Sequence, residues 1–424
     1  MNWEQLLSNE RLSGSRHEAE DRTRFNQDYG RVLYSGAFRR LQDKTQVFPL
    51  GRNDYVRTRL THSLEVANVG GSLAMFLADI IRSHEGAGRA EAWPLAEMKD
   101  IVATACLAHD IGNPPFGHSG EKAIENALEG TEFAGYAFEG NAQGFRLLTR
   151  TCDPIRNCGL DLTVATLGAF TKYPCTRRSR QDAFYHKFGI NEGEKEVFAR
   201  VAESCGLPQL AENVWARHPL AFLMEAADDI SYLIADIEDA FVCRIISYDE
   251  ARVKLGLLAA LDSKTFDRVE EERQAHGETA AIRFIRAMAV GRCIRALTET
   301  LDQRYDDIMR GRLLQSLTEV SALSSSYEAV KEFSVKRIYR HESVVKVEIT
   351  GFNIISRLME LFLEWVEHPK SNLGRKIGAI LHAEEAVSAE KMFRFLHVID
   401  YVSGMTDSYA LQTYQSLYGC LPMA

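Results

Sequence analysis

The sequence predicts a mainly α-helical protein with a short β element. Apolar residues recur every three to four positions in most windows, which is the spacing of one helix face. Only 10 of the 424 residues are proline, so few helices are interrupted. Hydrophobic residues make up 46% and charged residues 26%, a balance that is typical of soluble globular proteins and that excludes disordered and collagen-like chains. The length suffices for one large helical domain or for two to three smaller ones.

The first informative helix is expected to begin near Thr61 and to end in the glycine-containing loop at residues 86–88. Its buried face is predicted to carry Val66, Val69, Leu73, Phe76 and Ile80. His62 falls on the same face, so we expect its imidazole to point into the protein.

A second helix is expected from about Leu95, with a buried face made by Met98, Ile101, Val102 and Ala105. It must stop at the DIGNPP sequence of residues 110–115, because glycine and two prolines prevent its continuation. His109 is the next member of its buried face and is followed directly by Asp110. This end of the helix therefore presents an imidazole and a carboxylate side by side.

A third helix is expected from about Leu220, with Leu223, Ala227, Ile230, Ile234 and Ile237 directed inward. Asp228, Tyr232 and Asp236 are four residues apart in this helix and share the adjoining stripe. We therefore expect two carboxylates and a tyrosine to line one edge of the core.

Two other segments break the helical pattern. Residues 177–196 (RRSRQDAFYHKFGINEGEKE) are polar and contain glycines, which indicates a long excursion or flap rather than core. Residues 344–351 (VVKVEITG) alternate in polarity and predict the short strand or hairpin.

The overall composition excludes several classes of function. The formal net charge is −9, so no global basic field attracts nucleic acid or an anionic membrane, and a bound phosphate needs a local cluster of cations. None of the 8 cysteines forms a C-x-x-C pair, which disfavours a zinc ribbon and a disulfide frame. No secretory signal and no apolar run of about 18 to 20 residues is evident, so we expect a cytoplasmic protein that does not enter a membrane.

A metal site is predicted from the way the three helices converge. His62, His109 and Asp110 lie on faces expected to be buried, and one of the adjacent Asp228 and Asp229 joins them; helical geometry does not choose between these two. Singly, each histidine reads as a hydrogen-bonded core residue and Asp110 as a helix cap. Together they need a common partner, because buried ionised carboxylates are costly unless paired or metal-bound. Nitrogen and oxygen donors suit Mn²⁺, Mg²⁺, Fe²⁺ or Co²⁺.

These residues resemble a known family. The order His62, His109-Asp110 and an aspartate within EAADDISY (225–232) is similar to the H…HD…D signature of the HD-domain metal-dependent phosphohydrolases, an all-helical fold. Longer motifs resemble the deoxyguanosine triphosphate triphosphohydrolase branch, at residues 39–49 (RRLQDKTQVFP), 57–66 (RTRLTHSLEV), 109–118 (HDIGNPPFGH), 138–143 (FEGNAQ) and 401–407 (YVSGMTD). The likeness runs from about residue 20 to 410 and is weaker at 177–215 and 250–330.

The resemblance implies roles for individual residues. The metal ligands would be His62, His109, Asp110 and Asp228; Asp228 is preferred over Asp229 because the family places a tyrosine and an aspartate four and eight residues after the ligand. The catalytic pair would be His118 and Glu121, whose three-residue spacing lets both reach one point on a helix. The plain reading of Glu121 is an acid at a helix N-terminus.

Substrate contacts are implied in the same way. Arg59 and Lys172 match positions that bind the triphosphate, and Asn141 matches one near the sugar or phosphates. Gln46 and Val47 resemble residues that line the sugar and base, Tyr232 the aromatic under the ribose, and Asp236 a partner of the 3′-hydroxyl. Tyr339 and Glu348, beside the expected β element, resemble residues that read guanine. Gly140 stands where some relatives have histidine, so no third active-site histidine is assigned.

The implied reaction is hydrolysis of dGTP to deoxyguanosine and triphosphate, by water attack on the α-phosphorus. It needs a divalent metal ion, Mn or Mg, with Fe, Co or Ni as further candidates. The chain would divide into an HD-type catalytic core with an N-terminal substrate-binding segment (1–250) and a helical region (251–424) whose β element completes the nucleotide pocket. Whether His118 activates water or protonates the leaving oxygen stays open.

Two other functions fit the sequence. One is an HD hydrolase of other dNTPs or nucleotides. The other is a binding protein in which Arg177–Arg180 and the flap hold single-stranded DNA. The resemblance further implies a homo-oligomer, with a hexamer as one candidate.

Overall fold

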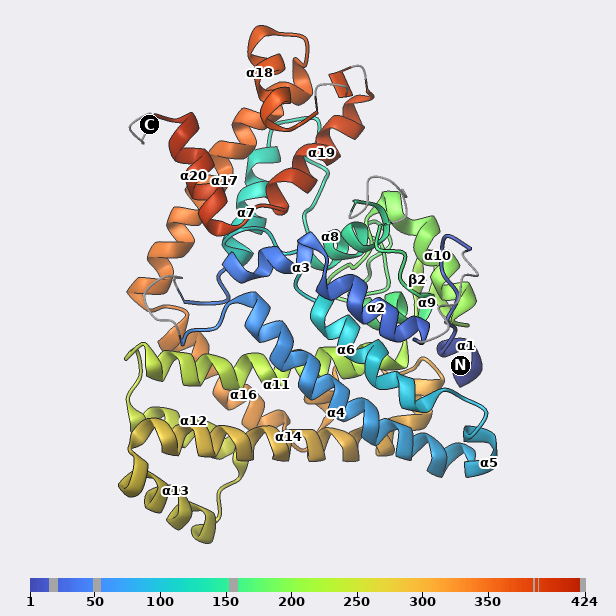
Figure 1. Ribbon diagram of the computed structural model, residues 1–424, viewed down its shortest axis with the longest axis vertical. Helices are drawn as coiled ribbons and strands as arrows, with labels where there is room; N and C mark the ends of the chain where they lie inside the picture. The colour runs from blue at the N-terminus through green and yellow to red at the C-terminus, as the bar shows by residue number, and fades with distance from the viewer. Residues whose placement is uncertain (15–21, 49–54, 152–158, 384–385, 388, 420–424) are drawn as a thin grey trace.

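The structure is a computed structural model that describes residues 1–14, 22–48, 55–151, 159–383, 386–387 and 389–419. Helices make up most of this part of the chain, which confirms the mainly α prediction (Figure 1). The longer helices are α2 (Arg24–Leu33), α4 (Arg59–Glu85), α6 (Met98–Ala108), α7 (Gly117–Leu128), α10 (Lys195–Ser204), α11 (Pro219–Val242), α12 (Tyr248–Ala259), α13 (Ser263–His276), α14 (Glu278–Met309), α16 (Ser324–Phe333), α17 (Glu342–Glu367), α19 (Lys391–Ser403) and α20 (Asp407–Leu417).

The remaining elements are short. The short helices are α1 (Trp3–Leu6), α3 (Gly36–Arg40), α5 (Ala87–Ala90), α8 (Gly140–Arg146), α9 (Val164–Phe170), α15 (Leu317–Val320) and α18 (Asn372–Ile380). Single turns of other helix types are η1 (Leu41–Asp43), η2 (Leu95–Glu97), η3 (Leu147–Thr151), η4 (Glu192–Glu194) and η5 (Ser334–Ile338). Strands β1 (Gln209–Ala211) and β2 (Val214–Trp215) form an antiparallel hairpin.

The three helices expected from the sequence are present as α4, α6 and α11. Helix α4 begins at Arg59 because the side chain of Thr58 accepts a hydrogen bond from the backbone of Thr61, and Thr61 bonds back to Thr58. Helix α11 begins at Pro219, which suits a first helical position because it has no N–H to leave unpaired. The three helices pack against one another in the largest hydrophobic cluster, to which α14 also contributes. This packing fixes the relative positions of the helices that carry the predicted ligands.

Helix α4 is the central element of this core. Its length and apolarity would allow it to cross a membrane, but 61% of its most apolar 18-residue window is buried inside the protein. Its predicted inward residues Val66, Val69, Leu73 and Ile80 are buried. The prediction for Phe76 was wrong, since this side chain is 44% exposed. Its neighbour Leu77 takes the buried position.

A second hydrophobic cluster joins α7 to the C-terminal helices α17, α19 and α20. Figure 1 shows α7 among these helices, at the end of the molecule opposite α13. The buried residues that α7 contributes are Ala123, Ile124 and Leu128. Helix α7 therefore packs with segments more than 200 residues away in the sequence, while α6, which precedes it, packs in the main core.

The predicted strand at residues 344–351 was wrong, because this segment is the first part of α17. Val344 and Gly351 are buried at helical spacing, and the buried positions continue with Ile354, Ile355 and Leu358. Gly351 is where the ring of Phe116 approaches the helix, because a Cβ there would lie 2.3 Å from the Cγ atom of Phe116. Packing over the full helix thus overrides the β preference of the Val-rich start.

The segment 177–196 was expected to be a flap outside the core. The structure instead buries its apolar residues Tyr185, Phe188 and Ile190. Tyr185 and Phe188 pack with Cys175 of the preceding segment and with Val214 of β2 in a small third cluster. Its polar residues 177–182 lie mostly at the surface, so the segment combines an exposed start with buried apolar anchors.

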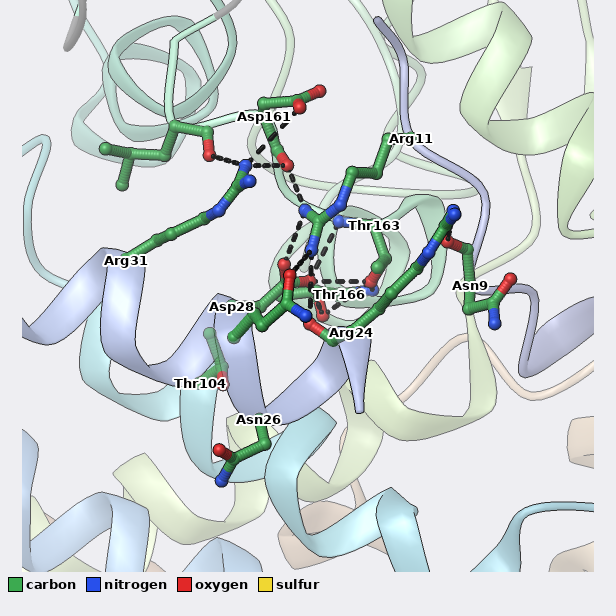
Figure 2. Close-up of polar contacts among 12 residues, drawn as sticks. Asn9, Arg11, Arg24, Asn26, Asp28, Arg31, Thr104, Asp161, Thr163 and Thr166 are labelled. Atoms are coloured by element: carbon green, nitrogen blue, oxygen red, sulfur yellow. Dashed lines mark hydrogen bonds and ion pairs between the residues drawn. The ribbon is translucent and has the colours of Figure 1, made fainter. Parts of the chain in front are cut away.

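A buried ion pair ties the N-terminal segment to the core (Figure 2). Arg11 lies 2.8 Å from Asp28 of α2, and the two side chains are 2% and 0% exposed. The same carboxylate accepts bonds from the backbone N–H and hydroxyl of Thr163, which caps α9, at 2.8 and 2.7 Å. Burial raises the pKa of Asp28 against the opposing effect of Arg11. One carboxylate therefore holds three segments together.

We expect the substitution Asp28→Asn to lower the free energy of unfolding by about 3 kcal/mol, because it leaves the guanidinium of Arg11 buried without an opposite charge. Chemical denaturation of the variant and the wild-type protein measures this difference. A loss below about 0.5 kcal/mol would show that Arg11 finds another partner or water.

Candidate active site

The predicted metal ligands meet where α4, α6 and α11 cross. One ligand atom each from His62, His109 and Asp110 lies within 4.8 Å of the others. Asp228 joins the group through its Oδ1 atom, which is 3.1 Å from His62 Nε2 and 3.5 Å from His109 Nε2. Two imidazoles and two carboxylates from three separated stretches of chain thus face one another.

This donor set fits a divalent cation. The Nδ1–H of His109 donates to the carbonyl oxygen of Cys106 at 2.6 Å, which leaves the lone pair of Nε2 for a ligand bond. Although burial lowers the pKa of His109, Asp110 and Asp228 raise it to about 9. Burial raises the pKa of Asp228, but His109 and His62 together bring it well below its ordinary value. The cluster therefore attracts positive charge, as a metal site must.

The neighbouring Asp229 points to different partners. It accepts a hydrogen bond of 2.7 Å from the hydroxyl of Thr318. Burial raises its pKa to about 7, against the opposing effect of Lys172. Of the two adjacent aspartates, Asp228 is the one whose carboxylate meets both imidazoles, as the resemblance implied.

His118 and Glu121 form a hydrogen-bonded pair on the first turn of α7. The distance between His118 Nδ1 and Glu121 Oε2 is 2.7 Å. The other carboxylate oxygen of Glu121 accepts from the backbone N–H of Gly140 at 3.0 Å, which fixes the acid in place. Burial raises the pKa of Glu121, but the hydrogen bond and charge of His118, with smaller effects of Lys187 and the Gly140 N–H, together lower the pKa below its ordinary value. The side chain of His118 is 80% exposed, so it is accessible to a ligand.

A left-handed turn places this pair. Phe116 has φ +60° and Gly117 φ +56°, in the region that only glycine adopts without strain. The turn follows Pro114 and Pro115, and Gly117 is already the first residue of α7. A Cβ at residue 117 would lie 2.8 Å from a guanidinium nitrogen of Arg59, so glycine also makes room for that arginine. Strain in the backbone is thus located between the predicted metal ligands and the predicted catalytic pair.

The two predicted phosphate-binding cations are each paired with an acid of the chain. Arg59 lies 2.8 Å from Asp110, and its side chain is 10% exposed. Lys172 lies 3.5 Å from Glu225; burial lowers its pKa, but Glu225 and nearby acids raise it well above the ordinary value. Asn141 donates to Glu139 at 2.7 Å. These cations remain charged at neutral pH and are held by acids.

The predicted sugar and base residues Tyr232, Tyr339 and Gln46 line the same cavity. The rings of Tyr232 and Tyr339 are 6.3 Å apart, and the hydroxyl of Tyr339 donates to Asp236 at 2.5 Å. Burial raises the pKa of Asp236 well above its ordinary value. The Oε1 atom of Gln46 is buried and, among the described residues, has no hydrogen-bond partner, which is typical of an acceptor that meets a ligand.

All of these groups surround one cavity of about 460 Å³, within the range of small-molecule sites. The predicted site residues that line it are Gln46, Val47, Arg59, His109, Asp110, His118, Glu121, Asn141, Lys172, Asp228, Tyr232, Tyr339 and Glu348. Two predicted residues do not line it. His62 is fully buried, and Asp236 accepts a hydrogen bond from the lining residue Tyr339. Glu348 reaches it from α17, so a helix supplies the group that was expected from a hairpin.

Sequence reasoning missed several lining residues. Asn113 donates a hydrogen bond to Asp110, and Lys187 lies 3.5 Å from Glu139. Tyr173 lies beneath the Lys172 ammonium, 5.6 Å from the ring centroid. Asn113 lies inside the HDIGNPPFGH motif and could have been found from its three-residue distance to Asp110. Lys187 lies in the segment predicted to be a flap, outside every motif, so nothing in the sequence indicates that it lines the cavity.

Comparison with known proteins agrees with this arrangement. Residues 59–150 match the HD domain family, and residues 320–416 match the phosphohydrolase-associated domain family. A deoxyguanosinetriphosphate triphosphohydrolase-like protein of Synechocystis sp. is 39% identical, over 99% of this chain and 99% of its own length. The chain belongs to the deoxyguanosine triphosphate triphosphohydrolase family of HD-domain proteins.

Other relatives extend the same family. A deoxyguanosinetriphosphate triphosphohydrolase-like protein of Pseudomonas aeruginosa is 36% identical over 99% of both chains. The deoxyguanosinetriphosphate triphosphohydrolase of Cronobacter sakazakii is 31% identical over 95% of both chains. Membership of this family makes the protein a phosphohydrolase that acts on nucleotides, and HD domains depend on a metal ion.

The arginines considered for DNA binding are partly engaged within the chain. Arg177 donates to the carbonyl of Gly135, and Arg180 donates to that of His186 at 2.5 Å. Arg180 also lies 3.8 Å from Asp182. These contacts fix the run to neighbouring segments of the chain.

Proposed function

We propose that the protein hydrolyses dGTP to deoxyguanosine and inorganic triphosphate, by attack of water on the α-phosphorus. The observation that carries the proposal is the single cavity onto which the His62, His109, Asp110 and Asp228 cluster and the His118–Glu121 pair both open. Two cations, Arg59 and Lys172, and two tyrosines, Tyr232 and Tyr339, also line its wall. The names of the relatives supply dGTP as the substrate to test first.

Arg59 and Lys172 are assigned to the triphosphate. Anionic oxygens repel an incoming nucleophile, so the site must neutralise them before water can attack. Both cations are held by acids of the chain, Arg59 by Asp110 and Lys172 by Glu225, so their positions are fixed before the substrate arrives. Because a fixed charge needs little reorganisation during the reaction, it lowers the activation barrier.

His118 is assigned to proton transfer. Glu121 occupies its Nδ1 atom, so Nε2 is the ring nitrogen that is available to the substrate or to water. Glu121 fixes the ring orientation and stabilises an imidazolium, as an acid does behind a catalytic histidine. His118 then either takes the proton of the attacking water or gives one to the leaving 5′-oxygen.

The bound metal ion, held by His62, His109, Asp110 and Asp228, would neutralise charge at the α-phosphate and lower the pKa of a water molecule. Nitrogen and oxygen ligands suit Mn²⁺ or Mg²⁺, with Fe²⁺, Co²⁺ or Ni²⁺ as further candidates. Among the chain's own groups, Asn113 orients Asp110 and the carbonyl of Cys106 orients His109. Both contacts hold a ligand in its binding orientation.

Sugar and base selection is assigned to the cavity residues around Tyr232 and Tyr339. Tyr232 would pack against the deoxyribose and leave no space for a 2′-hydroxyl, and Tyr339 holds Asp236 beside the expected 3′-hydroxyl. Gln46 and Val47 would line the sugar and base. Glu348 can accept from the N1–H and the exocyclic amine of guanine.

The reaction is tested by incubating the protein with dGTP, dATP, dCTP, dTTP and GTP, each with Mn²⁺ or Mg²⁺. We expect release of deoxyguanosine and intact triphosphate from dGTP, at a kcat/KM at least about tenfold above that for GTP, because the 2′-hydroxyl would collide with Tyr232. Chromatography of the nucleoside and the anion products measures both quantities. EDTA should stop the reaction, and excess Mn²⁺ should restore it.

Other product patterns would contradict parts of the proposal. Release of pyrophosphate or single phosphates would show that a different phosphate bond is cleaved. Equal rates with all four dNTPs would contradict the assignment of Tyr339 and Glu348 to guanine recognition. Binding of single-stranded DNA and a cytoplasmic location stay predictions from the sequence, and assembly into a homo-oligomer stays a prediction of the resemblance.

A further inference from the structure

The last of the five motifs, residues 401–407, supplies no group to the proposed reaction, although the structure places it against the site. It lies at the end of α19 and the start of α20, which pack in the second hydrophobic cluster. Its neighbour in space is Lys44 of the first motif, which lies directly after η1. Both segments also reach the loop that follows the metal ligands Asp110 and His109.

Lys44 is a lysine with almost no exposed surface. Its ammonium donates to the carbonyl oxygen of Asn113 at 2.5 Å and to that of Ser403 at 2.8 Å. Burial lowers the pKa of Lys44 to about 7, although Asp407 raises it. Asn113 in turn donates its side-chain amide to Asp110. One buried cation thus joins the C-terminal motif to the residue that orients a metal ligand.

Asp407 makes the complementary connection. Its Oδ1 atom accepts from the backbone N–H of Phe116 at 2.9 Å, and its Oδ2 atom accepts from that of Thr45 at 2.9 Å. The carboxylate is 7% exposed. Each of its two oxygens therefore holds a different segment of the chain.

The segments held in this way run directly into the cavity wall. Thr45 precedes Gln46 and Val47, and Phe116 is separated from His118 by Gly117 alone. The left-handed backbone of Phe116 is strained and persists only where surrounding contacts impose it. The bond from its N–H to Asp407 is such a contact. A short chain of bonds therefore runs from α20 to the proton-transfer group.

We infer that Lys44 and Asp407 are positioning residues, through which the C-terminal helices set the distance between the substrate-binding segment 45–47 and the catalytic loop 110–118. The inference rests on the proposed function. Neither side chain needs to touch the nucleotide; each acts through the backbone groups that it binds. The motif at 401–407 is then explained by the contacts it makes across the chain.

A purely structural role would change stability alone, whereas a positioning role would also change kcat or metal affinity. Two variants distinguish these roles. Asp407→Asn leaves one oxygen and one NH₂ group, so one of the two backbone N–H groups loses its acceptor. Lys44→Met keeps the length and apolar packing of the side chain but frees the carbonyl of Asn113. We expect Asp407→Asn to lower kcat for dGTP by about 10- to 100-fold, and Lys44→Met to lower Mn²⁺ affinity by about 10- to 100-fold.

The matched control is Asp28→Asn. Asp28 is also a buried carboxylate that accepts from a backbone N–H and faces a buried cation, but its partners Arg11 and Thr163 do not line the cavity (Figure 2). This variant should lower the melting temperature without changing kcat, KM or Mn²⁺ affinity. All measurements are made well below the melting temperature of each variant, with Mn²⁺ titrated alone into the nucleotide-free protein.

The outcomes are distinguishable. The inference is overturned if Asp407→Asn keeps the wild-type kcat and KM, or if Lys44→Met keeps the wild-type Mn²⁺ affinity, whatever their melting temperatures. If one variant does not fold, the other decides by its own measurement. A wild-type protein that binds no Mn²⁺ and releases no triphosphate overturns the proposed function, and this inference with it.

Discussion

The substitution Asp228→Asn is expected to lower kcat/KM for dGTP by at least about 10³-fold. An asparagine keeps the shape of the side chain but removes the charge that faces the Nε2 atoms of His62 and His109. A ligand lost from a catalytic metal site removes several kcal/mol of transition-state stabilisation, and 10³-fold corresponds to about 4 kcal/mol. Steady-state hydrolysis gives the rate, and the Mn²⁺ content of the purified variant gives the metal occupancy.

The adjacent aspartate provides the control for this prediction. Asp229→Asn changes the same charge one residue further along α11, where the carboxylate bonds to Thr318. We expect less than about a tenfold change, because an amide also accepts from a hydroxyl and Asp229 is partly protonated near neutral pH, its pKa being raised by burial to about 7. A larger loss from Asp229→Asn than from Asp228→Asn would reassign the metal ligand.

The substitution His118→Ala is expected to lower kcat by about 10² to 10⁴-fold, the usual contribution of a general acid or base. The side chain is 80% exposed and its Nδ1 atom bonds to Glu121 in the same helix, so its removal should not disturb the core. Nucleotide affinity should change by less than about threefold, because Arg59 and Lys172 are untouched. Rapid-quench turnover measures the chemical step, and calorimetric titration measures dGTP binding.

Glu121→Gln distinguishes the histidine from its support. The amide can still orient the ring, but it cannot stabilise an imidazolium, so we expect about a 10-fold loss and a changed pH dependence of kcat. Full activity of His118→Ala would exclude the histidine from the mechanism. Equal losses in kcat and in dGTP affinity would instead assign it to binding.

Much of the site could be predicted from local patterns. His62, His109 and Asp228 lie on helices whose apolar spacing is strong, so the direction of each side chain followed from helical geometry. Asp110 and His118 lie in a motif in which glycines and prolines fix the backbone. The choice of Asp228 over Asp229 needed the resemblance, because two adjacent positions of a helix border the same core.

The failures have a common cause. Residues 344–351 alternate over eight positions, and only the buried residues that follow, Ile354 and Leu358, reveal the helical period. The segment 177–196 is polar on average, yet Tyr185 and Phe188 are buried in a cluster with Val214. Val214 belongs to a hairpin that was not predicted from the sequence. Both errors came from windows too short to include the packing partner.

Contacts between distant segments were beyond local reasoning altogether. The bond from Lys44 to Ser403 spans 359 positions, and that from Thr45 to Asp407 spans 362. Lysine and aspartate in a polar stretch give no sign that they will be buried. Only the three-dimensional arrangement connects the first motif with the last.

The assignment of α7 to the C-terminal cluster has a consequence for the reaction. The helix that carries His118 packs in the second hydrophobic cluster, whereas α4, α6 and α11, which carry or directly precede the four proposed metal ligands, pack in the first. In the proposed reaction, the proton-transfer group and the metal site would therefore be aligned across the boundary between two hydrophobic clusters of the same chain. A substitution that shifts the packing of one cluster against the other, even far from the cavity, would then alter the reaction rate.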